Sequence, residues 1–134
     1  MINMEITTAK EENMNEILNL YYKLYPERKI VTKFNKIDLK SEIFIAKKDD
    51  VVVGFLITSF ISYIATKIGY IDELFIEEKF RKIDIGKSLV YKAIEWQRLN
   101  NAEVVFVTTD DAQEFYKKLG FRNLKNNSWL CKIP

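Results

Sequence analysis

The chain has 134 residues, of which 48% are hydrophobic and 30% are charged, and its formal net charge is +2 at pH 7. This length and composition are typical of one globular domain, residues 1–134, that buries a core without disulfides or a metal. Acidic and basic residues are interspersed, which gives no electrostatic support for a nucleic-acid partner. No apolar run reaches membrane-spanning length and the N-terminus does not resemble a signal peptide, so we expect a cytoplasmic protein without a membrane partner.

Taking the chain in order, the first elements are a strand and a helix. Residues 2–6 alternate between apolar and polar side chains as a strand does. Residues 8–11 resemble a capping box, and apolar residues then recur at helical spacing from Met14 to Leu24 until Pro26 ends the helix. The basic, weakly periodic stretch that follows predicts a loop with a short helix at about residues 34–39.

Strands dominate the middle of the chain. The pattern predicts a hairpin of two strands across residues 47–50, and then a third strand that pairs with the second. These strands are expected at residues 43–46, 51–57 and about 68–76.

The second half alternates helices with strands. Apolar residues at helical spacing predict a helix that runs to about Asn100, and a strand of buried type follows at residues 103–108. A short helix is expected to begin near Asp111 and to end at Gly120, with a last strand at about residues 128–133. This order predicts a mixed α/β fold, one sheet with helices on its faces.

Two features of composition limit the chemistry. The absence of histidine excludes Ser-His-Asp and Cys-His catalysis and histidine-ligated metals. The one cysteine, Cys131, cannot form an internal disulfide or a cysteine-rich metal site, so no metal is expected. Cys131 is either a nucleophile or, in the interpretation we favour, a small buried residue on the terminal strand.

The segment from Phe80 to Lys87 predicts an anion site. A basic, glycine-containing loop opens directly into a helix, where free backbone N–H groups and the helix dipole attract negative charge. Arg81, Lys82 and Lys87 add positive charge. The glycines of a P-loop or of a dinucleotide-binding fingerprint are missing, so the phosphate-bearing ligand belongs to another class.

A second motif, Phe115-Tyr116-Lys117-Lys118-Leu119-Gly120-Phe121, stands downstream of Arg81-x-x-Asp84-x-Gly86. Together the two motifs resemble the GNAT superfamily of acyl-CoA-dependent N-acetyltransferases, whose loop signature is Q/R-x-x-G-x-G/A and whose later helix commonly has F-Y-x-x-L-G-F. The resemblance implies a mixed, mostly antiparallel sheet with helices on both faces and a splayed strand pair at the cofactor site. It also implies acetyl-CoA as co-substrate. Relatives are often dimers, so a homodimer is an alternative to the monomer.

The resemblance further implies which residues contact the coenzyme. Backbone amides of the loop would hold the pyrophosphate, and the preceding strand would lie along the pantetheine arm and polarise the thioester carbonyl with a backbone N–H. Thr109 stands where many relatives have an asparagine that contacts the coenzyme. The residues implied for coenzyme binding are Leu74, Phe75, Ile76, Arg81, Lys82, Ile83, Asp84, Ile85, Gly86, Lys87 and Thr109.

Tyr116 matches the general acid of the family, which protonates the leaving thiolate. The acceptor amine must be neutral to attack the thioester, and an alkylammonium with a pKa of about 10.4 is mostly protonated at pH 7, so a general base is expected. Asp72 and Glu73 are the candidates. Successive strand side chains point to opposite faces, and we favour Asp72 because many relatives carry an acid two residues before the position of Leu74. The alternatives are a packing role for Tyr116 and ordinary strand-edge charges for the two acids.

The loop departs from the family at Asp84, which replaces the first glycine. Aspartate tolerates the left-handed backbone better than most residues, but its charge near a pyrophosphate must be offset by the neighbouring cations. Two functions follow: an acetyl-CoA-dependent N-acetyltransferase, or a non-catalytic acyl-CoA-binding sensor or interaction domain. In this fold the acceptor is contacted chiefly by residues 21–41 and 122–134, which leave small-molecule and protein amines both open.

Overall fold

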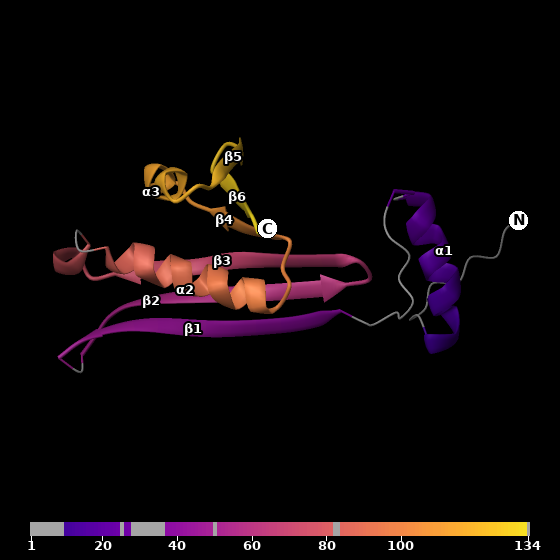
Figure 1. The fold of residues 1–134 in the computed structure, drawn as a ribbon, viewed down its shortest axis with the longest axis horizontal. Helices are drawn as coiled ribbons and strands as arrows, with labels where there is room; N and C mark the ends of the chain where they lie inside the picture. The colour runs from indigo at the N-terminus through magenta and orange to yellow at the C-terminus, as the bar shows by residue number, and fades with distance from the viewer. Residues whose placement is uncertain (1–9, 25, 28–36, 50, 82–83, 134) are drawn as a thin grey trace, which may run out of the picture.

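The structure is a computed structural model that describes residues 10–24, 26–27, 37–49, 51–81 and 84–133. The strand expected at residues 2–6 lies outside this described part, as do Lys82 and Ile83 of the predicted coenzyme loop. Helices and strands alternate along the described chain much as the sequence predicts (Figure 1). Their bounds are η1 (Glu11–Asn13), α1 (Met14–Leu24), β1 (Asp38–Lys48), β2 (Val51–Tyr63), β3 (Thr66–Ile76), η2 (Glu78–Phe80), α2 (Ile85–Leu99), β4 (Val104–Thr108), α3 (Gln113–Lys118), β5 (Arg122–Lys125) and β6 (Ser128–Lys132).

The strands form one mixed sheet with the order β1-β2-β3-β4-β6-β5. Only β3 and β4 pair in parallel, because the crossover through α2 returns the chain in the same direction. The other four neighbouring pairs are antiparallel. The expected mixed, mostly antiparallel α/β fold is therefore confirmed.

The prediction of a short helix at about residues 34–39 is wrong for the part of this stretch that the structure describes. Asp38 and Leu39 begin β1 and pair with Ser62 and Ile61 of β2. A weak helical period cannot compete with a ladder of hydrogen bonds to a neighbouring strand, so the hairpin extends well beyond the strands expected from local alternation. The first part of the expected helix lies outside the described residues.

The strand β5 (Arg122–Lys125) was not expected from the sequence. All four of its residues are exposed, so it lacks the apolar alternation of a half-buried strand. Asn126 follows with a φ of 53°, in the left-handed region, and turns the chain into β6. The Asn126-Asn127 pair is the signal that could have indicated this hairpin, since asparagine tolerates that conformation.

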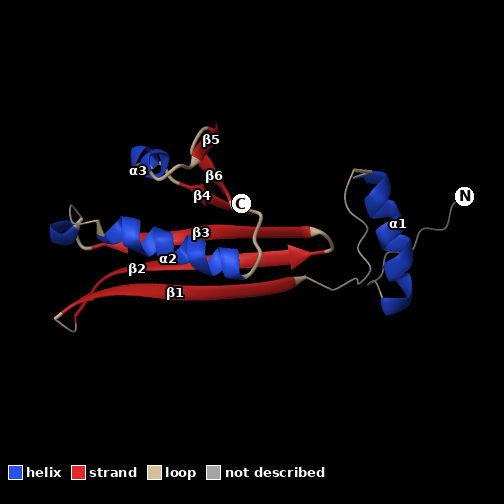
Figure 2. Cartoon of the chain, in the orientation of Figure 1, coloured by secondary structure: helices blue, strands red, loops and turns tan. Residues whose placement is uncertain are grey.

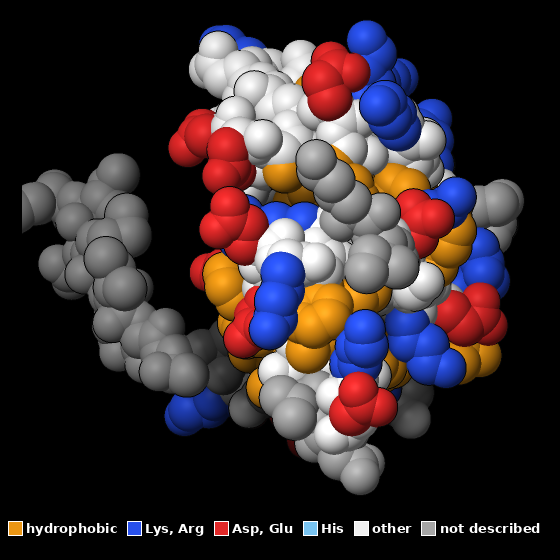
Figure 3. All heavy atoms as spheres, turned by 90° about the vertical axis from the view of Figure 1, so that its left-hand side faces the viewer, with side chains coloured by type: hydrophobic (Ala, Val, Ile, Leu, Met, Phe, Trp, Pro, Cys, Tyr) orange, Lys and Arg blue, Asp and Glu red, His pale blue; other side chains and the backbone are white. Residues whose placement is uncertain are grey.

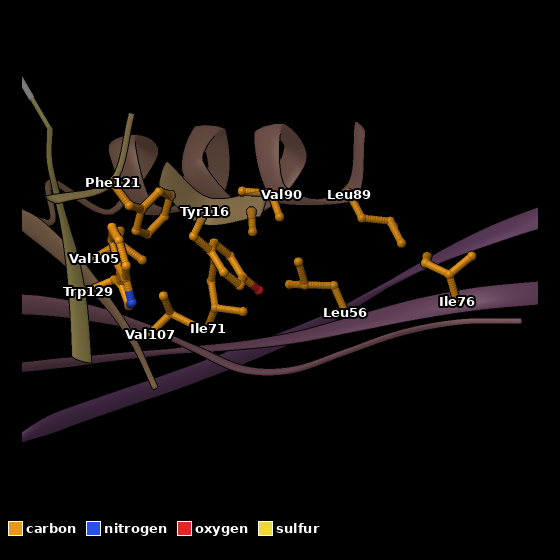
Figure 4. Packing of buried hydrophobic residues seen from close by; sticks show 11 residues of the cluster. Leu56, Ile71, Ile76, Leu89, Val90, Val105, Val107, Tyr116, Phe121 and Trp129 are labelled. Atoms are coloured by element: carbon orange, nitrogen blue, oxygen red, sulfur yellow. The ribbon is translucent and has the colours of Figure 1, made fainter. Parts of the chain in front are cut away.

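Both α2 and α3 pack on the same face of the sheet. Leu89, Val90 and Ala93 of α2 join Tyr116 of α3 in one buried cluster with side chains of the central strands (Figure 4). The strand residues of this cluster are Leu56, Ile71, Ile76, Val105, Val107 and Trp129. Alternation along each strand places every second side chain on this face, which explains the buried pattern of β4.

The opposite face of the sheet is apolar and partly exposed. Ile43, Ile45 and Phe75 are among its large exposed hydrophobic residues. The helix α1 lies beyond one end of the sheet (Figures 1 and 2), so helices cover only one face in the part of the chain that is described. Of the helices expected on both faces of the sheet, the described residues show α2 and α3 on one face.

Candidate functional site

The strands β3 and β4 separate at the middle of the sheet. Their parallel pairing ends at Ile71 and Val107. Beyond that point Thr108 pairs only with Ser128 of β6, while β3 continues along β2 to Ile76. The β4 side of β3 therefore has no strand partner after Ile71, which leaves backbone N–H and C=O groups available to a ligand. This is the splayed strand pair that the resemblance implies.

A β-bulge lies where the strands separate. Ile71 pairs with Thr58 and Glu73 pairs with Ile57, so Asp72 is an extra residue opposite β2. A bulge of this kind bends its strand and re-aims the side chains beside it. Asp72 and Glu73 are both exposed, so the strict alternation of β3 is broken where these two acids are adjacent.

A buried polar chain fixes β2 and β3 beside the bulge. Thr58 Oγ1 donates a hydrogen bond to the Tyr70 carbonyl oxygen at 2.7 Å, and Gln97 Nε2 donates to Thr58 Oγ1 at 2.8 Å and to the Ser59 carbonyl oxygen at 2.8 Å. Gln97 and Thr58 are fully buried. A Cβ on Gly69 would overlap the Gln97 carboxamide, so glycine is what lets α2 approach β3 here.

Gln97 was missed by the sequence reasoning. The available signal was a polar residue at a position where the spacing of α2 continues the apolar face of Leu89, Val90 and Ala93. Its Oε1 atom has no hydrogen-bond partner in the part of the chain that the structure describes. A buried amide with one unpaired acceptor is costly. Its two donated hydrogen bonds join α2 to β2, and the Thr58 hydroxyl continues the connection to β3 at Tyr70.

A groove of about 500 Å³ lies at the N-terminal end of α2 and brings together most of the predicted coenzyme residues. Its walls are formed by the end of β3, Arg81 after it and the first turn of α2, together with residues just before and within α3. Figure 3 views this end of the molecule, where apolar side chains lie exposed between acidic and basic ones. The lining residues are Leu74, Phe75, Ile76, Arg81, Asp84, Gly86, Lys87, Asp111, Ala112 and Phe115.

The backbone at Asp84 has the conformation that the glycine of the family signature would supply. Its φ of 55° and ψ of 16° lie in the left-handed region, and its side chain makes no capping hydrogen bond. The first N–H groups of α2 are thus not capped by this side chain. A Cβ on Gly86 would lie 3.3 Å from Phe115 Cζ, so glycine at that position lets α3 pack close to the start of α2.

The charges around the groove are balanced rather than positive in the described part. Arg81 donates from Nε to the Ile76 carbonyl oxygen at 2.8 Å, and its guanidinium lies 5.6 Å from the centroid of the Phe75 ring. Lys87 is the second lining cation, and Asp84 and Asp111 are two lining carboxylates. The attraction for an anion therefore depends on the N–H groups and dipole of α2 as much as on side-chain charge.

Ile85 and Thr109 have structural roles next to the groove. Ile85 packs against the buried cluster, so only its backbone is available at the helix start. Thr109 Oγ1 accepts a hydrogen bond from the Ala112 backbone N–H at 3.1 Å, and the Thr109 N–H donates to the Asn127 carbonyl oxygen at 2.9 Å. Thr109 thereby shapes the turn that leads into α3.

A second cavity of about 410 Å³ occupies the gap between the separated strands. Tyr116 lines it and is only 3% exposed, held edge-on between the rings of Phe115 and Phe121 at centroid distances of 5.0 and 5.2 Å. Burial raises the pKa of the Tyr116 hydroxyl to about 12. The hydroxyl points toward Ile71 and Leu56 (Figure 4), so a neutral phenol faces the interior of the site at physiological pH.

A third cavity, of about 490 Å³, involves side chains of the opposite face of the sheet. It shares four lining residues with the second cavity, two from each of the separating strands: Ile71, Asp72, Val107 and Thr108. The two cavities therefore meet where the strands part. Asp72 lines both cavities, whereas Glu73 lines only the second one.

A model of the GNAT acetyltransferase family matches residues 11–121. The chain belongs to the GNAT acetyltransferase family. It is 28% identical, over 147 aligned positions, to an uncharacterized N-acetyltransferase of Methanocaldococcus jannaschii. The alignment covers 96% of this chain, which spans 65% of the length of that relative.

Solved GNAT structures share the fold. An acetyltransferase from Bacillus cereus superposes with a TM-score of 0.62 at 15% identity, covering 97% of this chain and 98% of its own. The PaiA N-acetyltransferase of Thermoplasma acidophilum, solved in complex with coenzyme A, superposes with a TM-score of 0.57 at 17% identity over 69% of this chain and 61% of its own. At these identities the likeness concerns the fold alone.

The remaining candidate residue, Cys131, lies apart from this GNAT site. It is partly buried on β6 and lines a small cavity formed with α2 and with Leu119 and Phe121, which follow α3. This cavity is separate from the three described above. Burial raises the pKa of its thiol, and the nearby Arg98 lowers it by a smaller amount. These surroundings are typical of a packing residue. No described helix is long and apolar enough to cross a membrane.

Proposed function

We propose that this protein is an N-acetyltransferase that moves an acetyl group from acetyl-CoA to a primary amine by direct attack on the thioester. The observation that carries the proposal is the bulge at Asp72, where the cavity beside Tyr116 meets the cavity on the opposite face. A thioester between the separated strands would thus have a phenol on one side and a carboxylate on the other. The coenzyme A complex of the Thermoplasma PaiA structure supports the choice of coenzyme.

The coenzyme binds from the α2 end of the groove in this proposal. Its pyrophosphate lies against the backbone N–H groups at the start of α2, from Asp84 to Lys87, and Arg81 and Lys87 add charge. The pantetheine arm continues along Leu74–Ile76, where β3 lacks a β4 partner and its free backbone groups bind the amides of the arm. Thr109 contacts the same arm from the turn before α3.

The reaction is a single transfer within a ternary complex. The neutral amine nitrogen attacks the thioester carbonyl carbon, a backbone N–H of β3 stabilises the developing oxyanion, and the C–S bond breaks. The proton lost by the amine passes to Asp72, with Glu73 as the alternative base. A proton from Tyr116 goes to the leaving thiolate.

The raised pKa of Tyr116 is compatible with this role. A phenol at about 12 is a weaker acid than a thiol at about 8.5 in water, which by itself disfavours the transfer. The thiolate forms in the same low-dielectric site, however, and desolvation raises its proton affinity for the same reason. The two effects of burial offset one another, and the protonated phenol is always available as a donor.

A second candidate function is a domain that binds acyl-CoA and does not turn it over. Two features motivate it: Asp84 replaces the first glycine of the family signature in the loop where the pyrophosphate would lie, and two acids, Asp72 and Glu73, stand where one base is needed. Repulsion between the Asp84 carboxylate and a phosphate would weaken coenzyme binding in either function.

A thiol-release assay with acetyl-CoA and a broad panel of amines separates the two functions. We expect release that depends on the amine and that falls at least about 100-fold in Tyr116→Phe, the loss typical of a general acid. Tyr63→Phe is the matched control, since Tyr63 is an exposed tyrosine of β2 outside the three cavities. Binding of acetyl-CoA with no release from any amine would overturn the enzyme in favour of the binding domain.

A further inference from the structure

We propose that the acceptor of this enzyme is a primary monoamine with a flat, apolar body, bound in the third cavity with its amine at Asp72. The inference rests on the proposed function, because it assumes that the acceptor enters opposite the coenzyme. Hereafter this cavity is called the acceptor pocket. It is lined by Tyr70, Ile71, Asp72, Phe106, Val107, Thr108, Leu124 and Ser128.

An aromatic surface forms one part of the acceptor pocket. Tyr70 and Phe106 are opposite one another in the parallel ladder of β3 and β4. Their rings lie 5.7 Å apart between centroids with an interplanar angle of 31°. Tyr70 remains 39% exposed, so part of this surface is open to a ligand. A flat apolar group would bury itself here and gain the stacking energy of an aromatic contact.

The strand β5 supplies a further apolar contact. Leu124 is 45% exposed although it lines the pocket, on a strand whose other residues are polar. A large exposed leucine beside two open rings is the arrangement expected where an apolar ligand completes the surface. Leu124 and Ser128 are the lining residues that fall within residues 122–134, where acceptor contacts are expected. The aromatic pair, Tyr70 and Phe106, comes instead from the central strands β3 and β4.

The charge of the pocket selects the class of amine. Asp72 is the one ionisable carboxylate among the lining residues that the structure describes, and none of those residues is a lysine or arginine. One carboxylate matches one ammonium group. An α-amino acid would bring its own carboxylate close to Asp72 without a cation to offset it, and a polyamine would place its further charges on apolar surface.

The position of Asp72 also orients the acceptor. This residue is the bulged residue at the junction with the cavity of Tyr116, so an amine held there points at the separated strands. The aromatic pair lies on the other side, farther from the coenzyme groove, where it contacts the body of the acceptor and leaves the nitrogen free to react. Asp72 therefore binds the ammonium group; once that group has released one proton to solvent, the neutral nitrogen attacks and its next proton passes to Asp72.

Three amines test the inference: 2-phenylethylamine; L-phenylalanine, which is the same skeleton with a carboxylate; and spermidine, a linear polyamine. We expect the KM for 2-phenylethylamine to be at least about tenfold lower than for the other two, a difference of about 1.4 kcal/mol. Tyr70→Ala should raise that KM and leave the KM for ethylamine unchanged, because ethylamine is too short to reach the ring. Tyr63→Ala, which removes a tyrosine of similar exposure, should change neither value.

Other outcomes overturn the inference. An equal or lower KM for spermidine or L-phenylalanine contradicts the class, and an equal rise for both amines in Tyr70→Ala contradicts the contact. If Tyr70→Ala does not fold, Leu124→Ser on the peripheral β5 gives the same comparison. Isothermal titration of 2-phenylethylamine in the presence of coenzyme A separates this inference from the proposed function. Binding that Tyr70→Ala weakens supports the pocket even without turnover, and no binding refutes it.

Discussion

The Tyr116→Phe variant removes one hydroxyl group from the centre of the site and keeps the ring. No described residue forms a hydrogen bond to that hydroxyl, and the ring is held by Phe115 and Phe121. Loss of the hydroxyl therefore breaks no hydrogen bond among the described residues. At pH 7 we expect the free energy of unfolding to stay within about 1 kcal/mol of the wild-type value, since no hydrogen bond among the described residues is lost.

The same variant has a different effect at alkaline pH. Burial raises the pKa of Tyr116 from its ordinary value of 10.0 to about 12 in the folded protein. Because the folded-state pKa is the higher one, the stabilisation is complete below pH 10 and is lost as the pH rises through 12. Two pKa units correspond to about 2.7 kcal/mol in total, and about 1.4 kcal/mol of it is lost by pH 11.

Urea unfolding followed by tryptophan fluorescence measures both effects. The free energy of unfolding of wild type should fall relative to Tyr116→Phe between pH 10 and 12, whereas the difference should be flat from pH 6 to 9. The thiol-release rate should meanwhile drop by at least about 100-fold at pH 7. A variant that loses more than about 1 kcal/mol of stability at pH 7, or one that keeps the wild-type rate, would refute the assignment of a free, buried acid.

Three further predictions concern the bulge and the thiol. Gly69→Ala places a Cβ on the Gln97 carboxamide, so we expect a loss of about 1–3 kcal/mol in urea unfolding; an unchanged midpoint would contradict the close packing of α2 on β3. Asp72→Asn should lower kcat/KM at least about 100-fold in steady-state assays, while Glu73→Gln should leave it close to the wild-type value; the reverse result would make Glu73 the base. Cys131→Ser should leave kcat unchanged in steady-state assays, because direct transfer does not use the thiol, and an inactive but folded variant would indicate an acetyl-cysteine intermediate.

The fold was largely predictable because local pattern and long-range pairing agree in most elements. Buried strands such as β4 have continuous β-branched runs, and the helix α2 has an apolar face at helical spacing. The prediction failed where the pattern is weak. The residues of β5 are exposed, and the start of β1 is stabilised by its pairing with β2 rather than by its own alternation.

The groove after β3 could be predicted from a contiguous motif, since a loop and the helix after it are neighbours in both sequence and space; that its residues bind the coenzyme stays a prediction. The groove at Arg81, Asp84 and Gly86 is lined as that motif implies. The acceptor side was not predictable in the same way. The bulge at Asp72 is defined by pairing with a distant strand, and the buried Gln97 that fixes it comes from a helix far along the chain.

Mass spectrometry of a reaction mixture tests the central claim most directly. The protein is incubated with acetyl-CoA and 2-phenylethylamine, and the masses of the amine and of the intact protein are followed together. Direct transfer predicts that the amine gains one acetyl group for each coenzyme A thiol released, while the mass of the protein stays constant. An unmodified amine in the presence of bound acetyl-CoA, extended to the whole amine panel, would contradict the claim.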